Sequence, residues 1–452
     1  MNAIFKVLFF PIVLTLLFPQ CERNNNDPVD ITDDKFLEIL LERGIDSDGD
    51  GLISFAEAES IVELDVTGRY QGFEDYYNNG ILSMKGIEAF VSLESLQCGN
   101  HLITELDISN SPKLLYLDCS VNRLAGLDVS NNPLLQDLLC DGNQIKKLDI
   151  STNQDLEYLD CSGNQLSDLD VSANQTLEAL ACSENPLHSL DVSRNPDLIY
   201  LQCVSTELTT LDVSNNTKLE DLVCFNNHLT SIDVSRNINL EYFNCSHNPI
   251  SSLEIKDNAK LIWLRCSSNQ LGKLDVTRNS ELRDLSCSEN HLTNLDLSNN
   301  PQLNELYCSN NDLISLDVSH NPYLTDLYCA NNMIATLNFP DNLELRGINC
   351  NKNRLTTLDI SNLPKLEFLE CHENLLNSLI ISNISISGIF CSDNFLESLD
   401  ISSCTNLEAL VCANMPSLFE VCVWTMPFPP EGFYEMDTTG SPNVYFTTEC
   451  SK

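Results

Sequence analysis

The stretch that decides the fold runs from residue 156 to residue 171 and reads Leu156-Glu-Tyr-Leu-Asp-Cys161-Ser-Gly-Asn164-Gln-Leu166-Ser-Asp-Leu169-Asp170-Val171. Leucine, two residues, leucine, one residue, an apolar residue, two residues and asparagine occur here in that order. The same order then starts again at Leu166 and ends at Asn174. The alternations Leu-x-Cys and Leu-x-Val are typical of short strands with one face turned inward.

The same phrase recurs along most of the chain. One coil cannot bury its own apolar face, so stacked coils are expected to share a continuous core and a parallel ladder. Asparagine follows most of the cysteines by three residues, and its side chain can both donate to and accept from buried backbone groups. The cysteines, called ladder cysteines below, are 21 residues apart except for one step of 20: Cys98, Cys119, Cys140, Cys161, Cys182, Cys203, Cys224, Cys245, Cys266, Cys287, Cys308, Cys329, Cys350, Cys371, Cys391 and Cys412.

This phrase is similar to the leucine-rich repeat family, and most of all to its nested 21-residue bacterial subtype, over about Ile81 to Met415. The resemblance implies a right-handed solenoid of short, stacked parallel strands that binds proteins or other macromolecules, and it implies no reaction. We expect the repeats in residues 93–416. An N-terminal cap with a first partial repeat should fill residues 64–92, and an irregular C-terminal cap residues 417–452.

The ladder cysteines are interpreted as core residues, because a buried free cysteine behaves as a small hydrophobic side chain. Their thiols would point in parallel, so disulfides between them are geometrically poor. Cys422 and Cys450 differ, since they flank a proline-rich tail outside the repeat pattern. We expect a disulfide between these two that fastens the C-terminal cap; two free thiols are the alternative.

The first 20 residues form an export signal, in which Lys6 precedes an apolar run from Val7 to Phe18. Cys21 follows shortly after this run, and the arrangement resembles a bacterial lipoprotein signal. This resemblance implies that Cys21 is lipidated and that the protein is exported and lipid-anchored to a bacterial membrane, at the cell surface. Residues 21–34 would be a flexible tether. An ordinary signal peptide and an uncleaved anchor are the alternatives.

Residues 35–63 contain an acidic twelve-residue loop between two short apolar patterns, at residues 34–43 and 55–62. Ca²⁺ prefers six to eight oxygen ligands. The loop resembles EF-hand and dockerin loops, with Gly51 at the sharp turn, and so implies one structural Ca²⁺ in a small helical cap. A merely acidic turn is the alternative. The ligands that the resemblance assigns are Asp46, Asp48, Asp50, the carbonyl of Leu52, Ser54 and Glu57.

Aromatic residues recur three residues or one residue before the ladder cysteines. If Leu-x-Cys is the strand of a concave face, these positions point outward from the core. Such a row suits contacts with a protein or a glycan, although aromatic residues also simply favour exposed strand positions. The residues that we expect to bind a ligand are Tyr116, Tyr158, Tyr200, Tyr242, Trp263, Tyr307 and Tyr328.

An acidic row follows the second-half leucine of each copy. Its carboxylates would repel one another from coil to coil, so we expect backbone or hydroxyl donors of the nearby turn to offset them; counter-ion binding is the alternative. The row consists of Asp107, Asp128, Asp149, Asp170, Asp191, Asp212, Asp233, Glu254, Asp275, Asp296 and Asp317.

The overall charge excludes some classes of partner. The chain has 24 basic and 66 acidic residues and a net charge of −42, which repels nucleic acid and anionic lipid headgroups. No common catalytic motif is present, and the seven histidines occupy differing repeat positions. The sequence therefore predicts a non-enzymatic, surface-anchored scaffold for protein recognition or adhesion. A glycan-binding module or a docking subunit of a surface enzyme system is the alternative.

Overall fold

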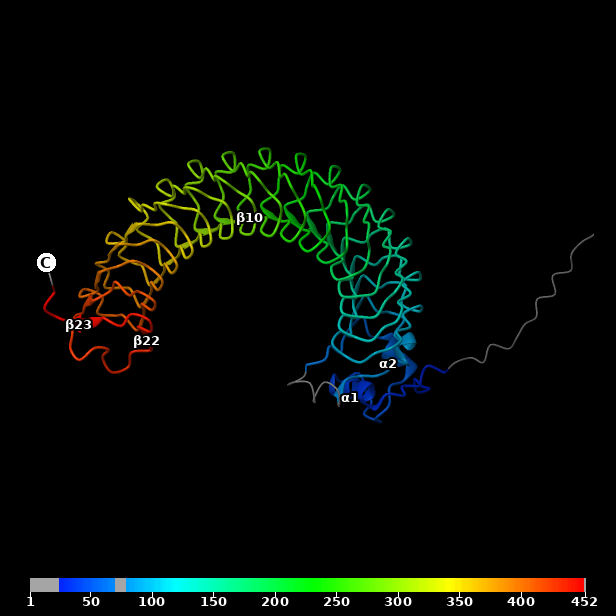
Figure 1. The fold of residues 1–452 in the computed structure, drawn as a ribbon. Coiled ribbons are helices and arrows are strands. Elements are labelled where there is room, and N and C mark those ends of the chain that lie inside the picture. The colour runs from blue at the N-terminus through cyan, green and yellow to red at the C-terminus, as the bar shows by residue number, and fades with distance from the viewer. Residues whose placement is uncertain (1–23, 70–78, 451–452) are drawn as a thin grey trace, which may run out of the picture.

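The structure is a computed structural model that describes residues 24–69 and 79–450. The predicted signal peptide and Cys21 lie outside these residues. Figure 1 shows coils stacked along an arc, with the N-terminal helices at one end and the last strands at the other. The predicted solenoid of short, stacked parallel strands is confirmed.

In the part of the chain that the structure describes, helices occur only at the N-terminal end, and every strand is three residues long. The elements are α1 (Asp34–Glu42), α2 (Phe55–Glu59), β1 (Glu63–Asp65), η1 (Ile87–Ala89), β2 (Ser95–Gln97), β3 (Tyr116–Asp118), β4 (Asp137–Leu139), β5 (Tyr158–Asp160), β6 (Ala179–Ala181), β7 (Tyr200–Gln202), β8 (Asp221–Val223), β9 (Tyr242–Asn244), β10 (Trp263–Arg265), β11 (Asp284–Ser286), β12 (Glu305–Tyr307), β13 (Asp326–Tyr328), β14 (Gly347–Asn349), β15 (Thr357–Asp359), β16 (Phe368–Glu370), β17 (Ser378–Ile380), β18 (Gly388–Phe390), β19 (Ser398–Asp400), β20 (Ala409–Val411), β21 (Glu420–Cys422), β22 (Glu435–Asp437) and β23 (Tyr445–Thr447).

The main sheet has 18 parallel strands and lines the inner side of the arc, as Figure 1 shows at β10. Residues 21 apart lie opposite each other, as Tyr158 and Ala179 do. The 20-residue copy keeps this register, because Phe368 lies opposite Gly388.

The second halves of the coils form strands only toward the C-terminus. Among the described residues these strands are β15 with β17, and β19 with β21 and β23. The sequence suggested a strand in every Leu-x-Val half. Because the coils follow an arc, neighbouring coils are closest on its inner side and farther apart on its outer side. The outer halves of most coils therefore lack ladder pairing.

One continuous apolar core runs from Val29 to Val423. In the coil quoted first, Leu156, Leu159 and Cys161 are fully buried. Burial of such a side chain contributes about 1.5–3 kcal/mol relative to leaving it exposed. All ladder cysteines are buried free thiols, as their predicted packing role requires.

The asparagine three residues after most ladder cysteines links adjacent coils. Asn164 donates to the carbonyl oxygens of Cys140 at 2.9 Å and Cys161 at 3.0 Å, and its Oδ1 accepts from the Ile145 N–H at 2.9 Å. The buried Asn164 amide thus acts both as hydrogen-bond donor and as acceptor, as the repeat predicted.

Other residues replace asparagine at both ends of this ladder, and Thr206 replaces it within the ladder, where its hydroxyl donates to the Cys203 carbonyl oxygen at 2.9 Å. His101 takes the first position, where the Ile81 N–H donates to Nδ1 at 3.2 Å and Nε2 lies 2.5 Å from the Val66 carbonyl oxygen. Ser441 takes the last position and donates to the Cys412 carbonyl oxygen at 2.8 Å.

The C-terminal cap has more regular structure than its sequence suggested. In it, β22 pairs with β20 on the inner sheet and β23 pairs with β21 on the outer one. The tail thus completes one further coil, which covers the last full repeat.

The N-terminal cap is bonded to the first repeat. Asp33 caps α1 through Oδ1, which accepts from the Lys35 and Phe36 N–H groups. Its Oδ2 accepts from the N–H groups of Leu82 at 2.8 Å and Ser83 at 3.0 Å. One carboxylate therefore ties the helix to the solenoid.

Candidate binding surface and calcium loop

The seven aromatic residues predicted to bind a ligand all lie on strands of the inner sheet. The central residue of each strand is buried, so its flanking residues face away from the core. Trp263 is 39% exposed and Tyr328 is 37% exposed, while the other five are partly buried. The structure thus places these residues on one face, and we call this face of β2–β22 the concave surface.

Neighbouring rings on the concave surface contact each other. Tyr307 and Tyr328 are stacked, with centroids 4.9 Å apart and an interplanar angle of 14°. Tyr242 and Trp263 are tilted, with centroids 6.3 Å apart. Such contacts fix the rings before any ligand arrives, which lowers the entropy cost of binding.

Carboxylates separate the aromatic rings toward the N-terminal end. Burial, and then the nearby charge of Asp160, raise the pKa of Asp141 to about 6. Burial and the charges of Asp160 and Asp141 also raise the pKa of Tyr158. Asp141 and Asp160 therefore lie close enough to each other and to Tyr158 for their charges to raise these pKa values.

The row of aromatic residues extends further than the sequence indicated. Phe368 on β16 is 52% exposed, and Phe390 on β18 contacts the ring of His372, with centroids 6.1 Å apart. The predicted row ended at Tyr328, and Gly347 is the next residue that stands three residues before a ladder cysteine. The same spacing, followed past Gly347, would have found Phe368.

The ladder thiols are unsuited to nucleophilic chemistry. Burial raises the pKa of Cys203, Cys245 and Cys329 to about 12. A thiolate is the reactive form of cysteine, and it is essentially absent at neutral pH when the pKa is so high.

The acidic loop brings its predicted carboxylates together. Oxygen atoms of Asp46, Asp48 and Asp50 lie within 4.8 Å of one another. The N–H of Gly51, at a φ of +81°, donates to Asp46 Oδ2 at 2.9 Å. Only glycine adopts this conformation without strain. Three converging carboxylates are the kind of donor set that Ca²⁺ prefers.

Glu57, the last predicted ligand, lies in the first turn of the exit helix α2 and faces the loop. Its Oε1 accepts from Ser47 N–H at 2.6 Å, and its Oε2 accepts from Ser54 N–H at 2.9 Å. The donors of Ser54 and Ser47 lower the pKa of Glu57 to about 2, so it is ionised at neutral pH. Both of its oxygens thus accept hydrogen bonds from residues of the loop. The ligand set remains a prediction.

The outer acidic row is offset by local donors, as predicted. Asp149 Oδ1 accepts from the N–H of Ser151 at 3.0 Å and from its hydroxyl at 2.6 Å. These bonds lower the pKa of Asp149.

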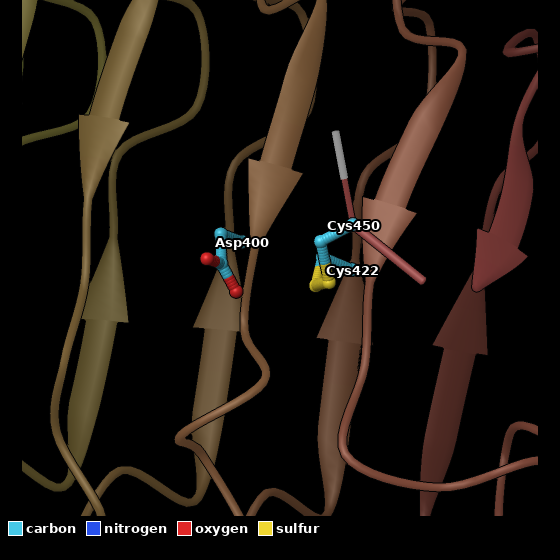
Figure 2. Close-up of side chains that lie close together, drawn as sticks. All are labelled: Asp400, Cys422 and Cys450. Atoms are coloured by element: carbon cyan, nitrogen blue, oxygen red, sulfur yellow. A yellow bond between two sulfur atoms is a disulfide. The ribbon is translucent and has the colours of Figure 1, made fainter. Parts of the chain in front are cut away.

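Cys422 and Cys450 are joined as a disulfide, and their Cα atoms are 5.5 Å apart. Figure 2 shows the Asp400 carboxylate beside this pair, on the neighbouring coil. The bond fastens the end of the tail to β21. In the described part of the chain, no helix is long and apolar enough to cross a membrane.

Comparison with known proteins identifies the family. No family model matches the chain, and no curated protein matches it significantly. Among solved structures, the functional domain of InlJ from Listeria monocytogenes, which includes a cysteine ladder, is 32% identical, with a TM-score of 0.63. The match covers 82% of this chain and 74% of that domain.

Two other bacterial structures share the fold at lower identity. The leucine-rich-repeat protein LIC12759 from Leptospira interrogans is 23% identical, with a TM-score of 0.61, over 74% of this chain and 93% of its own. YopM from Yersinia enterocolitica is also 23% identical, with a TM-score of 0.62, over 91% and 94% of the two chains. With its 21-residue coils and its ladder of buried thiols, the chain belongs to the bacterial leucine-rich-repeat proteins.

Proposed function

We propose that the protein is an exported, non-enzymatic recognition scaffold that binds a protein ligand on its concave surface. The observation that carries this proposal is the gathering of exposed and partly buried aromatic side chains on one face of a long parallel sheet. Aromatic residues dominate the binding energy of protein interfaces. An arc of stacked repeats also offers a partner an extended surface.

Buried thiols and paired carboxylates support a binding role over a catalytic one. The thiols have raised pKa values and lie under the sheet. The outer aspartates accept hydrogen bonds from their own turns. These groups therefore serve the fold.

One Ca²⁺ in the acidic loop belongs to this proposal as a structural ion. The loop is linked to the segment that precedes α1, because the N–H of Val29 donates to the carbonyl oxygen of Ile53 at 2.7 Å. An ion held by Asp46, Asp48, Asp50, the Leu52 carbonyl, Ser54 and Glu57 would neutralise the carboxylates and stiffen this cap.

Anchoring through a lipid on Cys21 completes the proposal and rests on the sequence alone. The test is Cys21→Ser in cells. The variant should leave the membrane fraction and appear in the soluble exported fraction. A variant that still sediments with membranes contradicts lipid anchoring.

Binding is tested by capture of surface proteins with a concave variant and a matched control. The concave variant is Tyr158→Ala with Tyr200→Ala and Trp263→Ala. The control removes exposed apolar groups elsewhere, with Ile314→Ala, Tyr323→Ala and Leu343→Ala. The proposal is supported if the wild type and the control capture a ligand that the concave variant does not capture.

Two outcomes of the same experiment oppose it. Equal loss in both variants means that the concave surface is not the binding face. Retention of oligosaccharides on a glycan array, lost only in the concave variant, favours the alternative of a glycan-binding module, for which the exposed ring of Trp263 is suited.

A further inference from the structure

Three acidic side chains stand in register at the centre of the concave surface. Asp284 on β11 lies opposite Glu305 on β12, and Glu305 lies opposite Asp326 on β13. Neighbouring strands are about 4.8 Å apart, so these side chains are stacked on one face. We call these residues the central acidic row.

Too few basic side chains lie near the central acidic row to neutralise its three carboxylates. Arg265 Nη2 donates to Asp284 Oδ2 at 3.0 Å, and Arg265 is the one basic residue in the strands of the described inner sheet. Glu305 accepts only a neutral donor, the Tyr307 hydroxyl, at 2.9 Å. Asp326 likewise accepts from the Thr325 hydroxyl at 2.8 Å. One cation therefore faces three carboxylates.

One oxygen of this row is both buried and unpartnered. Asp284 is 5% exposed, and its Oδ1 has no hydrogen-bond partner. A buried acceptor without a donor costs about 1–3 kcal/mol, and more when it is charged. Among the described residues, Asp284 has the one buried charged side-chain oxygen without a partner, and the other unpartnered buried side-chain atoms are asparagine oxygens of the solenoid.

Aromatic rings enclose the central acidic row. Trp263 lies opposite Asp284 on the neighbouring strand, and the stacked pair of Tyr307 and Tyr328 belongs to the same strands as Glu305 and Asp326. On the C-terminal side stands Gly347, where a Cβ would come within 2.9 Å of Asp326 Oδ1. Gly347 itself therefore adds no side chain to the row.

These features select the chemistry of a ligand. A neutral glycan could stack on Trp263, but it would leave the carboxylates desolvated and uncompensated. A small cation would use the carboxylates and leave the rings unused. A guanidinium group combines positive charge, several N–H donors in one plane and a flat face that stacks on aromatic rings.

We infer that the centre of the concave surface binds an arginine-bearing segment of a polypeptide partner, with its guanidinium on the row of Asp284, Glu305 and Asp326 beside Trp263. This inference rests on the proposed function and names the chemical class of the partner. The same segment would continue along the N-terminal strands, where Asp137 and Asp160 alternate with tyrosines.

The test uses the whole exported protein and fluorescent peptides of alternating residues at 150 mM salt. The arginine–glycine peptide should bind more tightly than the lysine–glycine peptide, and the glutamate–glycine peptide should not bind. Glu305→Gln with Asp326→Asn should weaken binding of the arginine peptide at least tenfold, because the amides keep the shape and remove the charge. Trp263→Ala should reduce the preference for arginine over lysine.

A matched control separates the site from the large net charge. Asp155→Asn with Asp168→Asn makes the same change of charge at exposed residues outside the sheet and should leave binding within twofold. Equal weakening in both double variants, or tighter binding of a neutral oligosaccharide or of Ca²⁺ alone at the row, overturns the inference.

Failure of this inference is distinguishable from failure of the proposed function. If the peptides do not bind while the captured ligand still depends on Tyr158, Tyr200 and Trp263, only the arginine class is wrong. If no ligand depends on those residues, the recognition function is wrong as well.

Discussion

At the scale of the residue, each coil contains a backbone position that strains most side chains. Two residues after the ladder cysteine, φ is positive, as at Val121 (49°), Asn226 (56°) and Gly163 (62°). The left-handed conformation costs roughly 1–2 kcal/mol for an ordinary residue, and most for a β-branched one. The repeated asparagine bonds between coils hold the turn in this shape.

Val121→Gly should therefore stabilise the protein, by about 1 kcal/mol, because glycine adopts this φ freely. Val121 is 45% exposed, so little packing is lost. Chemical denaturation measures the change. Asn226→Gly is the control and should be nearly neutral, since asparagine tolerates the left-handed region. A loss of stability in Val121→Gly would contradict the account of strain.

Asp141 gives a pH dependence of known sign. Its pKa in the folded protein is raised to about 6, above an unfolded value of about 3.9, so folding favours its protonated form. Its ionisation therefore lowers stability as pH rises from about 4 to 6. The groups facing it are Asp118, Asp160 and Tyr158.

Asp141→Asn should stabilise the protein at pH 7 by about 1 kcal/mol, after a discount for partial exposure, and by nothing below pH 4. Thermal unfolding of both proteins across this range measures the difference. Asp128→Asn should show the opposite sign at pH 7, because the donors of Ser130 lower the pKa of Asp128. The same sign in both variants would contradict the assignment.

At the scale of the element, the calcium loop lies between α1 and α2. Three carboxylates within 4.8 Å repel one another unless a cation joins them. Calcium at a hundred times its dissociation constant should stabilise the cap by about 2.7 kcal/mol. Hydrogen exchange of α1 and α2 with calcium and with chelator measures this local effect.

Asp46→Asn with Glu57→Gln should abolish the calcium-dependent protection of α1 and α2. Glu59→Gln, an acidic residue of α2 outside the predicted ligand set, should retain it. Protection that is the same with calcium and with chelator in the wild type would show that the loop is only an acidic turn.

The sequence predicted the repeated elements because every coil obeys the same spacing of leucine, cysteine and asparagine. It did not predict β22 and β23, since Thr438 stands at the cysteine position and Ser441 at the asparagine position of that coil. Only the backbone pairing of Ala409 with Glu435 reveals the additional turn.

Part of the binding surface could likewise be predicted from the sequence. Seven aromatic residues followed from their distance to a ladder cysteine. The burial of Asp284 did not, because it results from Arg265 on the preceding strand and from the packing of three coils. Contacts between coils depend on the identities of residues 19 to 21 positions apart, which a single repeat does not show.

At the scale of the whole molecule, each coil contacts mainly its neighbours, so damage should remain local. Cys422→Ala with Cys450→Ala removes the bond that fastens the last coil, which typically costs about 2–4 kcal/mol. Hydrogen exchange should rise at β20 and β22 and remain unchanged at β5. Uniform loss of protection would show that the solenoid unfolds as one unit.

Leu159 pairs with Leu180, and the leucine at the centre of most inner strands pairs in the same way with its equivalent in the next coil. This regular pairing has a consequence for how such a gene can change length. Excision or duplication of 63 nucleotides would rejoin chemically equivalent positions, whatever the breakpoint within the repeats. The product would be a shorter or longer arc in which the asparagine bonds between coils are intact. Reach could then be adjusted in steps of about 4.8 Å without redesign of any interior contact.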